Sequence, residues 1–180
     1  MPRLEPPTRE ALLPADQAIW DEIVGSRGRV IGPYLPLMKV PALAQRVAAL
    51  GEQLRFHSLL PAADRELAIL ATGREVGAKF EWAAHEPIAR REGTRSEAIE
   101  AVRSQGPLDA LSGRERLIIT VVRSLYRDHV LSDTLYAQAI KDLGEQTLVE
   151  LVTLTGFYGL IGFVLNAFEL PLPEGAQQPF

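Results

Sequence analysis

The sequence contains no cysteine among its 180 residues. That absence excludes disulfide bonds, thiolate metal sites and any thiol redox cycle within this chain. A strong excess of one charge is also lacking, since 19 Lys and Arg residues stand against 23 Asp and Glu residues, for a net charge of −4. No basic cluster is interleaved with aromatic residues, so we expect no nucleic-acid partner.

Long uninterrupted apolar runs are absent as well. The longest, Leu151–Leu165, is broken by glycines and threonines and is shorter than the roughly 20 residues that cross a bilayer. We interpret it as a buried helix and expect no membrane partner. The N-terminus is polar and rich in proline, without the charged start and apolar stretch of a secretory signal, so we expect a cytoplasmic location.

Composition and periodicity predict one helical domain. Hydrophobic residues make up 47% of the chain, which allows a sizeable core. Prolines at positions 2, 6, 7 and 14 predict an extended N-terminal arm over residues 1–14. Apolar residues at helical spacing then run through residues 15–170, residues 171–180 form an extended tail, and no alternating segment favours a strand. We therefore predict an all-α bundle of about six to eight helices.

The segment from Pro61 to Gly93 carries the residue types that catalysis needs, on two predicted helices. Glu66 shares a helical face with apolar and small residues, and Glu81 lies four residues before His85 on the apolar face of the next helix. Carboxylates and an imidazole on buried faces are costly unless they are paired, because desolvation disfavours their charged forms. These three residues are our candidate catalytic residues.

Other interpretations of the same pattern stand beside this one. A glutamate and a histidine four residues apart are also typical of ordinary subunit contacts, and an inward glutamate can pair with a structural arginine such as Arg74 or Arg123. Two carboxylates and one imidazole could instead hold a divalent metal ion. A further alternative is a non-catalytic oligomer that binds a small ligand or acts as a scaffold.

Several features follow one another in the order typical of the carboxymuconolactone decarboxylase family, which the chain resembles from about Gly28 to Leu170. They are Glu66, then Glu81-x-x-x-His85, a glycine at position 93, the helix SEAIEAV and the closing stretch VELVTLTGFYGLIGFVLNAFE. In the alkylhydroperoxidase-like branch of that family a CxxC pair precedes the histidine by seven and four residues. Here Ala78 and Glu81 occupy those positions, so thiol-based peroxide reduction is excluded. A glutamate four residues before the histidine resembles the decarboxylase branch.

The resemblance implies an alkylhydroperoxidase-like helical fold and a homo-oligomer, either a trimer or a hexamer. It also implies a lyase, hydrolase or isomerase that acts on a small lactone or cyclic carboxylic acid, as in the catabolism of aromatic compounds. We expect this enzyme to use no cofactor and no metal. His85 would be its general acid and base, with Glu66 and Glu81 setting the tautomer and basicity of the ring.

The candidate substrate-binding residues come from two regions of the sequence. Arg29 and Tyr34 lie in a segment broken by glycine and proline, where binding groups often gather. Arg74 and Trp82 lie within the two central helices. Arg29, Arg74 and Arg90 are also candidates for holding a substrate carboxylate, although Arg90 lies off the helical face that bears His85.

Overall fold

The computed structural model describes residues 2–180 and shows helices joined by short connections, with no strand in that range. The prediction of an all-α fold is confirmed. The elements are a 3₁₀ helix η1 (Arg9–Ala11) and the α-helices α1 (Pro14–Arg27), α2 (Tyr34–Leu37), α3 (Pro41–Phe56), α4 (Ala62–Glu75), α5 (Lys79–Arg91), α6 (Ser96–Arg103), α7 (Gly113–Arg127), α8 (Asp133–Leu143) and α9 (Glu145–Ala167). The described part thus has nine α-helices, because a single turn, α2, forms where we expected only a loop.

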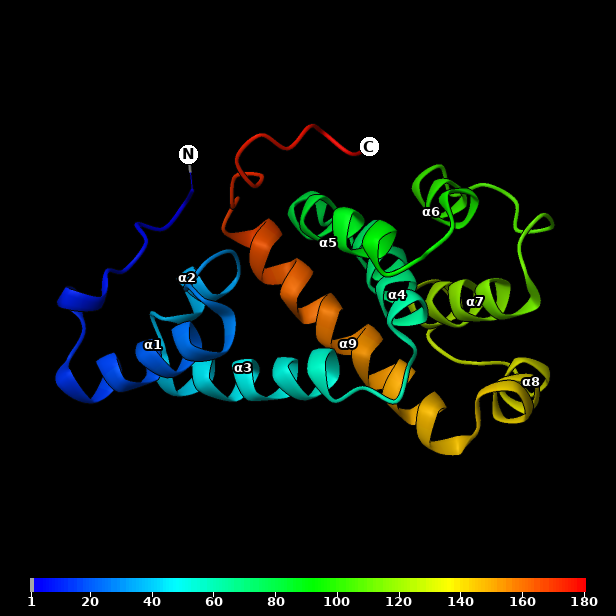
Figure 1. Cartoon of the computed structure of the whole chain (residues 1–180), viewed down its shortest axis with the longest axis horizontal. Coiled ribbons are helices and arrows are strands. Elements are labelled where there is room, and N and C mark those ends of the chain that lie inside the picture. The colour runs from blue at the N-terminus through cyan, green and yellow to red at the C-terminus, as the bar shows by residue number, and fades with distance from the viewer. Residues whose placement is uncertain (1) are drawn as a thin grey trace.

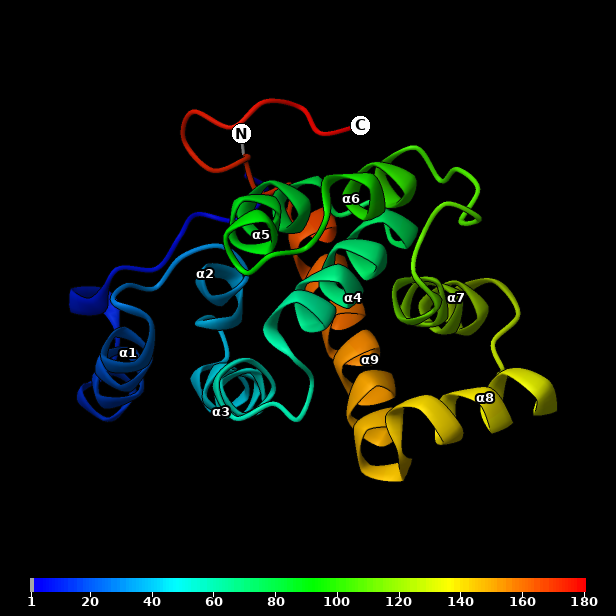
Figure 2. The ribbon, with the colours of Figure 1, turned by 45° about the vertical axis from the view of Figure 1, so that its right-hand side comes forward.

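Two helices make the centre of the molecule. Figures 1 and 2 show α9 running through the middle, with α1 to α3 on one side of it and α7 and α8 on the other. The helix α4 packs against α5, α6, α7 and α9. Every residue from Glu66 to Gly73 is consequently buried. A carboxylate on this helix is therefore removed from water by its surroundings.

The apolar helix α9 extends beyond the apolar run Leu151–Leu165. It begins at Glu145 and has 23 residues, so by length and composition it could cross a membrane. Our argument that this segment is too short for a bilayer was therefore wrong. A single such helix is weak evidence for a membrane protein, because 56% of its most apolar window is buried inside the protein, as in a core helix.

Both ends of the described chain lie against the helical body. Met1, the first residue of the predicted arm, lies outside the described residues. The Arg3 amide donates to the Phe168 carbonyl at 3.0 Å, which holds the arm beside the end of α9. The tail, residues 171–180, returns over α5, where the Phe180 ring meets the Trp82 ring edge to face at 5.5 Å between centroids.

Candidate active site

The structure brings the three predicted catalytic residues together, with a carboxylate beside each nitrogen of the His85 ring. The Nδ1 atom of His85 lies 2.7 Å from Glu66 Oε2, and its Nε2 atom lies 3.0 Å from Glu81 Oε1. The three side chains are at most 6% exposed. Glu81 and His85 meet because residues four apart share one face of α5, and Glu66 reaches them because α4 packs directly against that helix. We call this arrangement the carboxylate–histidine relay.

The relay holds the imidazole in its charged form. Burial alone lowers the pKa of His85, but its hydrogen bonds to Glu66 and Glu81 outweigh burial and raise that pKa to about 9. Burial raises the pKa of Glu66, and the bond to His85 again prevails and lowers it. At neutral pH the site is thus an imidazolium between two carboxylates, with a proton on each ring nitrogen.

The relay geometry does not suit a metal ion. Glu66 and Glu81 lie at different nitrogens of the His85 ring, and those two nitrogens point in different directions. One ion cannot bind all three side chains in that arrangement. In the part of the chain that the structure describes, no group of three or more His, Asp or Glu residues is placed to hold a metal. As placed in this structure, these three residues therefore do not form the ligand set of one divalent metal ion.

A cavity of about 160 Å³ borders the relay. Its lining comes from α1, α2, α3, α5, α9 and the segment before α2: Arg27, Ile31, Gly32, Pro33, Tyr34, Gly51, Arg55, Phe80, Glu81, Ala84, His85, Phe157, Tyr158 and Ile161. Glu81 and His85 reach this cavity, whereas Glu66 lies behind them. The relay therefore runs from the cavity wall into the core.

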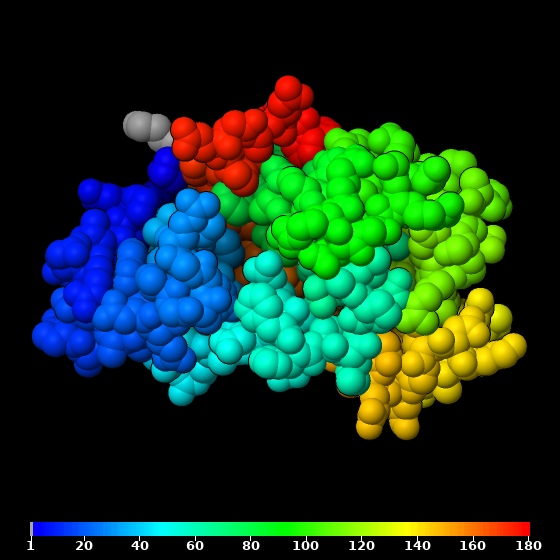
Figure 3. All heavy atoms as spheres, viewed as in Figure 1, coloured from blue at the N-terminus to red at the C-terminus, as the bar shows by residue number. Residues whose placement is uncertain are grey.

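The cavity opens into a wider groove, of about 1300 Å³, that runs between α5, the segment before α2 and the C-terminal tail. His85, Arg55 and Phe80 border both spaces. Figure 3 shows a hollow on this face between the residues around α2 and those of α5, with α9 visible at its floor. A small molecule thus has a path from solvent to the relay.

Two tyrosines give the cavity neutral hydrogen-bonding groups. The Tyr158 ring meets the His85 ring edge to face, with 5.3 Å between centroids. Burial raises the pKa of Tyr158 well above its ordinary value, and burial also raises the pKa of Tyr34. Both phenols are therefore protonated at neutral pH and can donate hydrogen bonds to a ligand.

Two arginines that the sequence analysis did not select also line the cavity. The Arg27 guanidinium lies 4.7 Å from the centroid of the Tyr34 ring and donates to the Ala48 carbonyl at 2.7 Å. Arg55 is half-buried on α3. The sequence did contain a signal for Arg55. Gly51 and Arg55 are four residues apart and share one helical face, and a glycine inside a helix indicates that another group approaches closely there.

The structure places the four predicted substrate-binding residues in three different locations. Tyr34 lines the cavity. Arg29 and Trp82 border only the outer groove, where Trp82 is fully buried and donates from Nε1 to Glu86 at 2.7 Å. Arg74 reaches neither space, since it donates to the Arg103 carbonyl at 2.8 Å and lies over the Phe180 ring.

The structural arginines that we considered as partners of an inward glutamate do not contact the relay. Arg74 bonds to the Arg103 carbonyl at 2.8 Å, and Arg123 lies beside Glu75 at 3.9 Å. Glu66 instead has Arg65 at 3.5 Å, in addition to His85. The relay is therefore supported by one arginine behind it but still reaches the cavity through Glu81.

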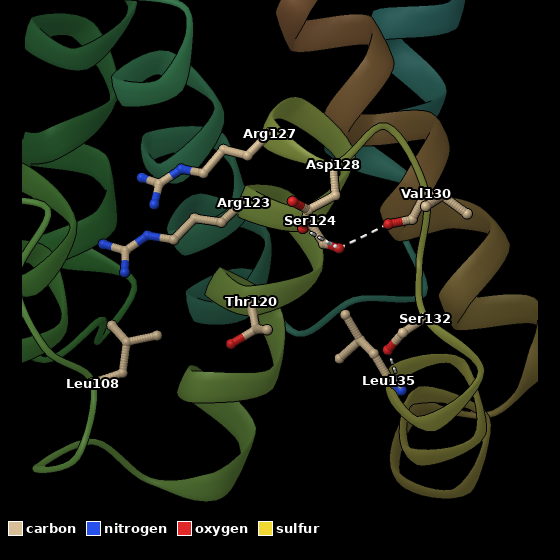
Figure 4. A pocket seen from close by; sticks show the side chains of 9 residues that line it. All are labelled: Leu108, Thr120, Arg123, Ser124, Arg127, Asp128, Val130, Ser132 and Leu135. Atoms are coloured by element: carbon tan, nitrogen blue, oxygen red, sulfur yellow. Dashed lines mark hydrogen bonds between the residues drawn. The ribbon is translucent and has the colours of Figure 1, made fainter.

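A separate hollow, of about 540 Å³, lies between α7 and α8, away from the relay. Figure 4 shows its lining, with Arg123 and Arg127 projecting from α7 on one side and Leu135 on the other. Arg127 forms a bidentate pair with Glu75, Arg123 donates to two backbone carbonyls, and the Ser124 hydroxyl donates to the Val130 carbonyl at 2.7 Å. We call it the α7–α8 groove.

Known proteins resemble this chain in sequence over its middle helices and in fold over most of its length. The model of the carboxymuconolactone decarboxylase family matches residues 41–124, from α3 to most of α7. That range includes the whole relay. No curated protein matches the chain in sequence.

Three solved structures are similar. An uncharacterized peroxidase-related protein from Ralstonia eutropha JMP134, described as an alkylhydroperoxidase AhpD core, is 18% identical, with 96% of this chain and 93% of that chain covered and a TM-score of 0.78. An uncharacterized peroxidase-related protein from Silicibacter sp. TM1040 is 16% identical, with 96% and 92% covered and a TM-score of 0.76. A variant of the debrominase Bmp8 in complex with 2,3,4-tribromopyrrole is 15% identical, with 94% and 90% covered and a TM-score of 0.74.

At these identities the solved structures establish the fold alone, and the family match adds the segment that carries the relay. The resemblance predicted from the sequence is therefore confirmed: residues 41–124 match the model of the carboxymuconolactone decarboxylase family, and the chain has an alkylhydroperoxidase-like fold.

Proposed function

We propose that this chain is an enzyme that moves a proton on a small lactone or cyclic carboxylic acid, without a cofactor, as a lyase, hydrolase or isomerase. The family match is consistent with catalysis or a related function on small molecules. The observation that carries the proposal is the carboxylate–histidine relay, which ends in the wall of a cavity open to solvent through a groove. Buried, coupled ionisable groups beside a cavity are typical of catalytic sites.

The relay divides the acid and base roles between two residues. Both nitrogens of His85 already face carboxylates, so Glu81, which lines the cavity, offers an oxygen to the substrate. A proton on His85 Nε2 can pass to Glu81 and from there to a substrate atom. Glu66 stabilises the imidazolium from the other side and holds the proton on Nδ1. His85 then acts as the proton store and Glu81 as the contact group.

A decarboxylation shows how the parts would work together. In an unsaturated lactone acid whose carboxylate-bearing carbon is conjugated with the lactone carbonyl, loss of carbon dioxide leaves an electron pair delocalised onto that carbonyl oxygen as a dienolate, and one carbon of this anion must take a proton. Glu81 would deliver this proton and the imidazolium would replace it, after which solvent reprotonates the relay. The neutral phenols of Tyr34 and Tyr158 would donate to the oxygen on which charge develops.

Proton NMR in D₂O tests this proposal without knowledge of the reaction. A panel of small lactones and cyclic unsaturated carboxylic acids is incubated with the protein, and deuterium incorporation at carbon, ring opening and loss of carbon dioxide are followed together. We expect wild-type protein to turn over at least one member, and Glu81→Gln to slow it by about 10²- to 10⁴-fold. Glu97→Gln, an exposed change of equal charge on α6, is the matched control. Full turnover by Glu81→Gln would contradict the proposal.

The non-catalytic alternative is separated by the same experiment. A protein that only binds a small ligand would shift the ligand resonances without deuterium incorporation or product. Because a cavity lies beside the relay, a scaffold role with a closed site is the less supported form of that alternative.

We also propose that the chain forms a homo-oligomer, a trimer or a hexamer. The helix α9 exposes apolar side chains along one face at helical spacing, namely Val149, Val152, Leu160 and Phe163. An exposed apolar stripe of this kind is typical of a protein interface. Light scattering coupled to gel filtration measures the mass directly, and Phe163→Glu should reduce the association. A wild-type protein that is monomeric at all concentrations would contradict this proposal.

A further inference from the structure

We propose that Arg55, together with Arg27 and Tyr34, forms a subsite for the carboxylate of a small monocarboxylate ligand, in the same cavity as Glu81. This inference names the ligand class of the proposed active site and rests on that site being the functional one. It concerns binding, however, and can be tested apart from catalysis.

The missing counter-ion of Arg55 is the first argument. Among residues 2–180 no carboxylate lies within ion-pair distance of its guanidinium and no group accepts a hydrogen bond from it, although the side chain is half-buried. The half-buried Arg103 and Arg123 are paired with Glu86 and Glu75. Arg27 and Arg74 lack a carboxylate partner but donate to backbone carbonyls, which Arg55 does not. The chain has more acidic than basic residues, so an unpaired, partly desolvated guanidinium in a cavity indicates a place for an anion from solution.

The packing around Gly51 is the second argument. A Cβ atom at this position would lie 3.1 Å from the Tyr34 hydroxyl oxygen, 3.3 Å from Arg27 Nη2 and 2.8 Å from a carbon of the Phe157 ring. The hydroxyl and the guanidinium of two other helices therefore meet over the bare backbone of α3. Arg55 is one helical turn further along α3 and lines the same cavity. Donors from three helices thus converge where glycine leaves room.

Arg27 retains donors for a ligand. A guanidinium has five N–H groups, and in Arg27 the structure assigns one from Nη1 to the Ser26 hydroxyl and one from Nη2 to the Ala48 carbonyl. These two bonds fix the orientation of the side chain, the Tyr34 hydroxyl lies beside the same guanidinium, and the N–H groups that remain can donate to a ligand. A carboxylate can accept hydrogen bonds from two arginines and a phenol at once. No single one of these donors would satisfy every lone pair of its oxygens.

The size and charge of the cavity restrict the ligand. Its volume of about 160 Å³ is below the roughly 300–1,000 Å³ of pockets for drug-sized molecules, so the ligand is small. Phe80, Phe157 and Ile161 give an apolar surface for the rest of the molecule. The Glu81 carboxylate would repel a second carboxylate placed beside it. The cavity therefore favours a monocarboxylate with an apolar body over a dicarboxylate.

Calorimetric titration with benzoate, crotonate and the neutral isostere benzamide tests the subsite. We expect wild-type protein to bind benzoate or crotonate, and benzamide at least tenfold more weakly. Arg55→Gln should reduce carboxylate affinity at least tenfold, and Arg55→Lys, which keeps the charge, should reduce it less. Arg46→Gln is the matched control, because Arg46 is an exposed arginine of the same helix and its loss changes the net charge equally.

Three results would overturn the subsite: equal binding of benzoate and benzamide, unchanged carboxylate binding by a folded Arg55→Gln variant, or no binding of either carboxylate by wild-type protein at about 10 mM. Glu81→Gln separates this inference from the proposed function. It should keep or strengthen carboxylate binding, since it removes a repelling charge, while turnover is lost. Binding that depends on Arg55 in a protein without any turnover would leave the subsite standing and contradict the enzyme.

Discussion

The α7–α8 groove and the relay cavity differ in a way that volume does not reveal. The groove is the larger, at about 540 Å³ against about 160 Å³. Its arginines are already engaged by Glu75 and by backbone carbonyls. The cavity instead holds a guanidinium without a counter-ion, that of Arg55, which lies over the Phe56 ring at 5.4 Å from its centroid, and a buried imidazolium. Under our proposal, the charge that lacks a counter-ion and the perturbed imidazolium therefore mark the functional hollow, whereas volume does not.

The two hollows also differ in what holds their charges. In the Arg127–Glu75 pair the Arg127 side chain is 45% exposed and the Glu75 side chain is 8% exposed. Solvent therefore screens this ion pair, which contributes modestly to stability. The three relay side chains are at most 6% exposed, and loss of one partner leaves a buried charge without compensation. Substitutions in the two places should consequently differ several-fold in cost.

Replacement of the relay histidine should have the largest effect. His85→Ala removes the imidazolium from between two buried carboxylates, and we expect the free energy of unfolding to fall by about 3–5 kcal/mol. Urea denaturation followed by circular dichroism measures this loss. His57→Ala, at the exposed C-cap of α3, should change stability by no more than about 0.5 kcal/mol. Equal losses in the two variants would show that the relay carries no special electrostatic role.

The pH dependence of stability should follow the same histidine. The folded pKa of His85, about 9, lies above its ordinary value of 6.5. Its charged form therefore stabilises the fold fully below pH 6.5, and that contribution is lost as pH rises through 9. The loss is on the order of 3 kcal/mol. Urea denaturation between pH 6 and 10 should show this loss of unfolding free energy in the wild type. The Arg127→Gln variant, which is changed only in the α7–α8 groove, should show the same loss. A His85→Gln variant with the same alkaline loss would assign it to another group.

A change of cavity volume should have a smaller effect, on binding rather than on the fold. In Gly51→Ala the new methyl group would displace Phe157, Tyr34 or Arg27, and we expect benzoate to bind about tenfold more weakly, which is about 1.4 kcal/mol. Gly25→Ala is the matched control, because nothing lies within 4 Å of a Cβ atom at that helical position. Calorimetric titration compares the two variants, and equal affinities would place the ligand elsewhere.

The groove variant should have the smallest effect. Arg127→Gln breaks a partly exposed ion pair and should cost no more than about 1 kcal/mol of unfolding free energy. Carboxylate binding should be unchanged, because this residue does not border the cavity. A loss of benzoate affinity in this variant, measured by the same titration, would move the ligand site to the α7–α8 groove.

Local spacing was enough to predict the helices and the relay. The offset of four residues places Glu81 and His85 on one face of α5 wherever that helix packs, and the apolar neighbours of Glu66 identify the buried face of α4. Long-range packing was not available from one sequence. Arg74 reaches the tail because Phe180 returns over it, and Arg27 reaches the cavity because α1 packs against α3. Neither contact can be predicted from the periodicity of the sequence.

A crystal structure of the protein soaked with benzoate tests the central claim most directly, because both hollows are then seen in one experiment. We predict that the carboxylate lies against Arg55 in the cavity, with the ring beside Glu81, while the α7–α8 groove holds no benzoate. Benzoate bound at Arg123 and Arg127, with the cavity unoccupied, would contradict the claim that unpaired charge identifies the site.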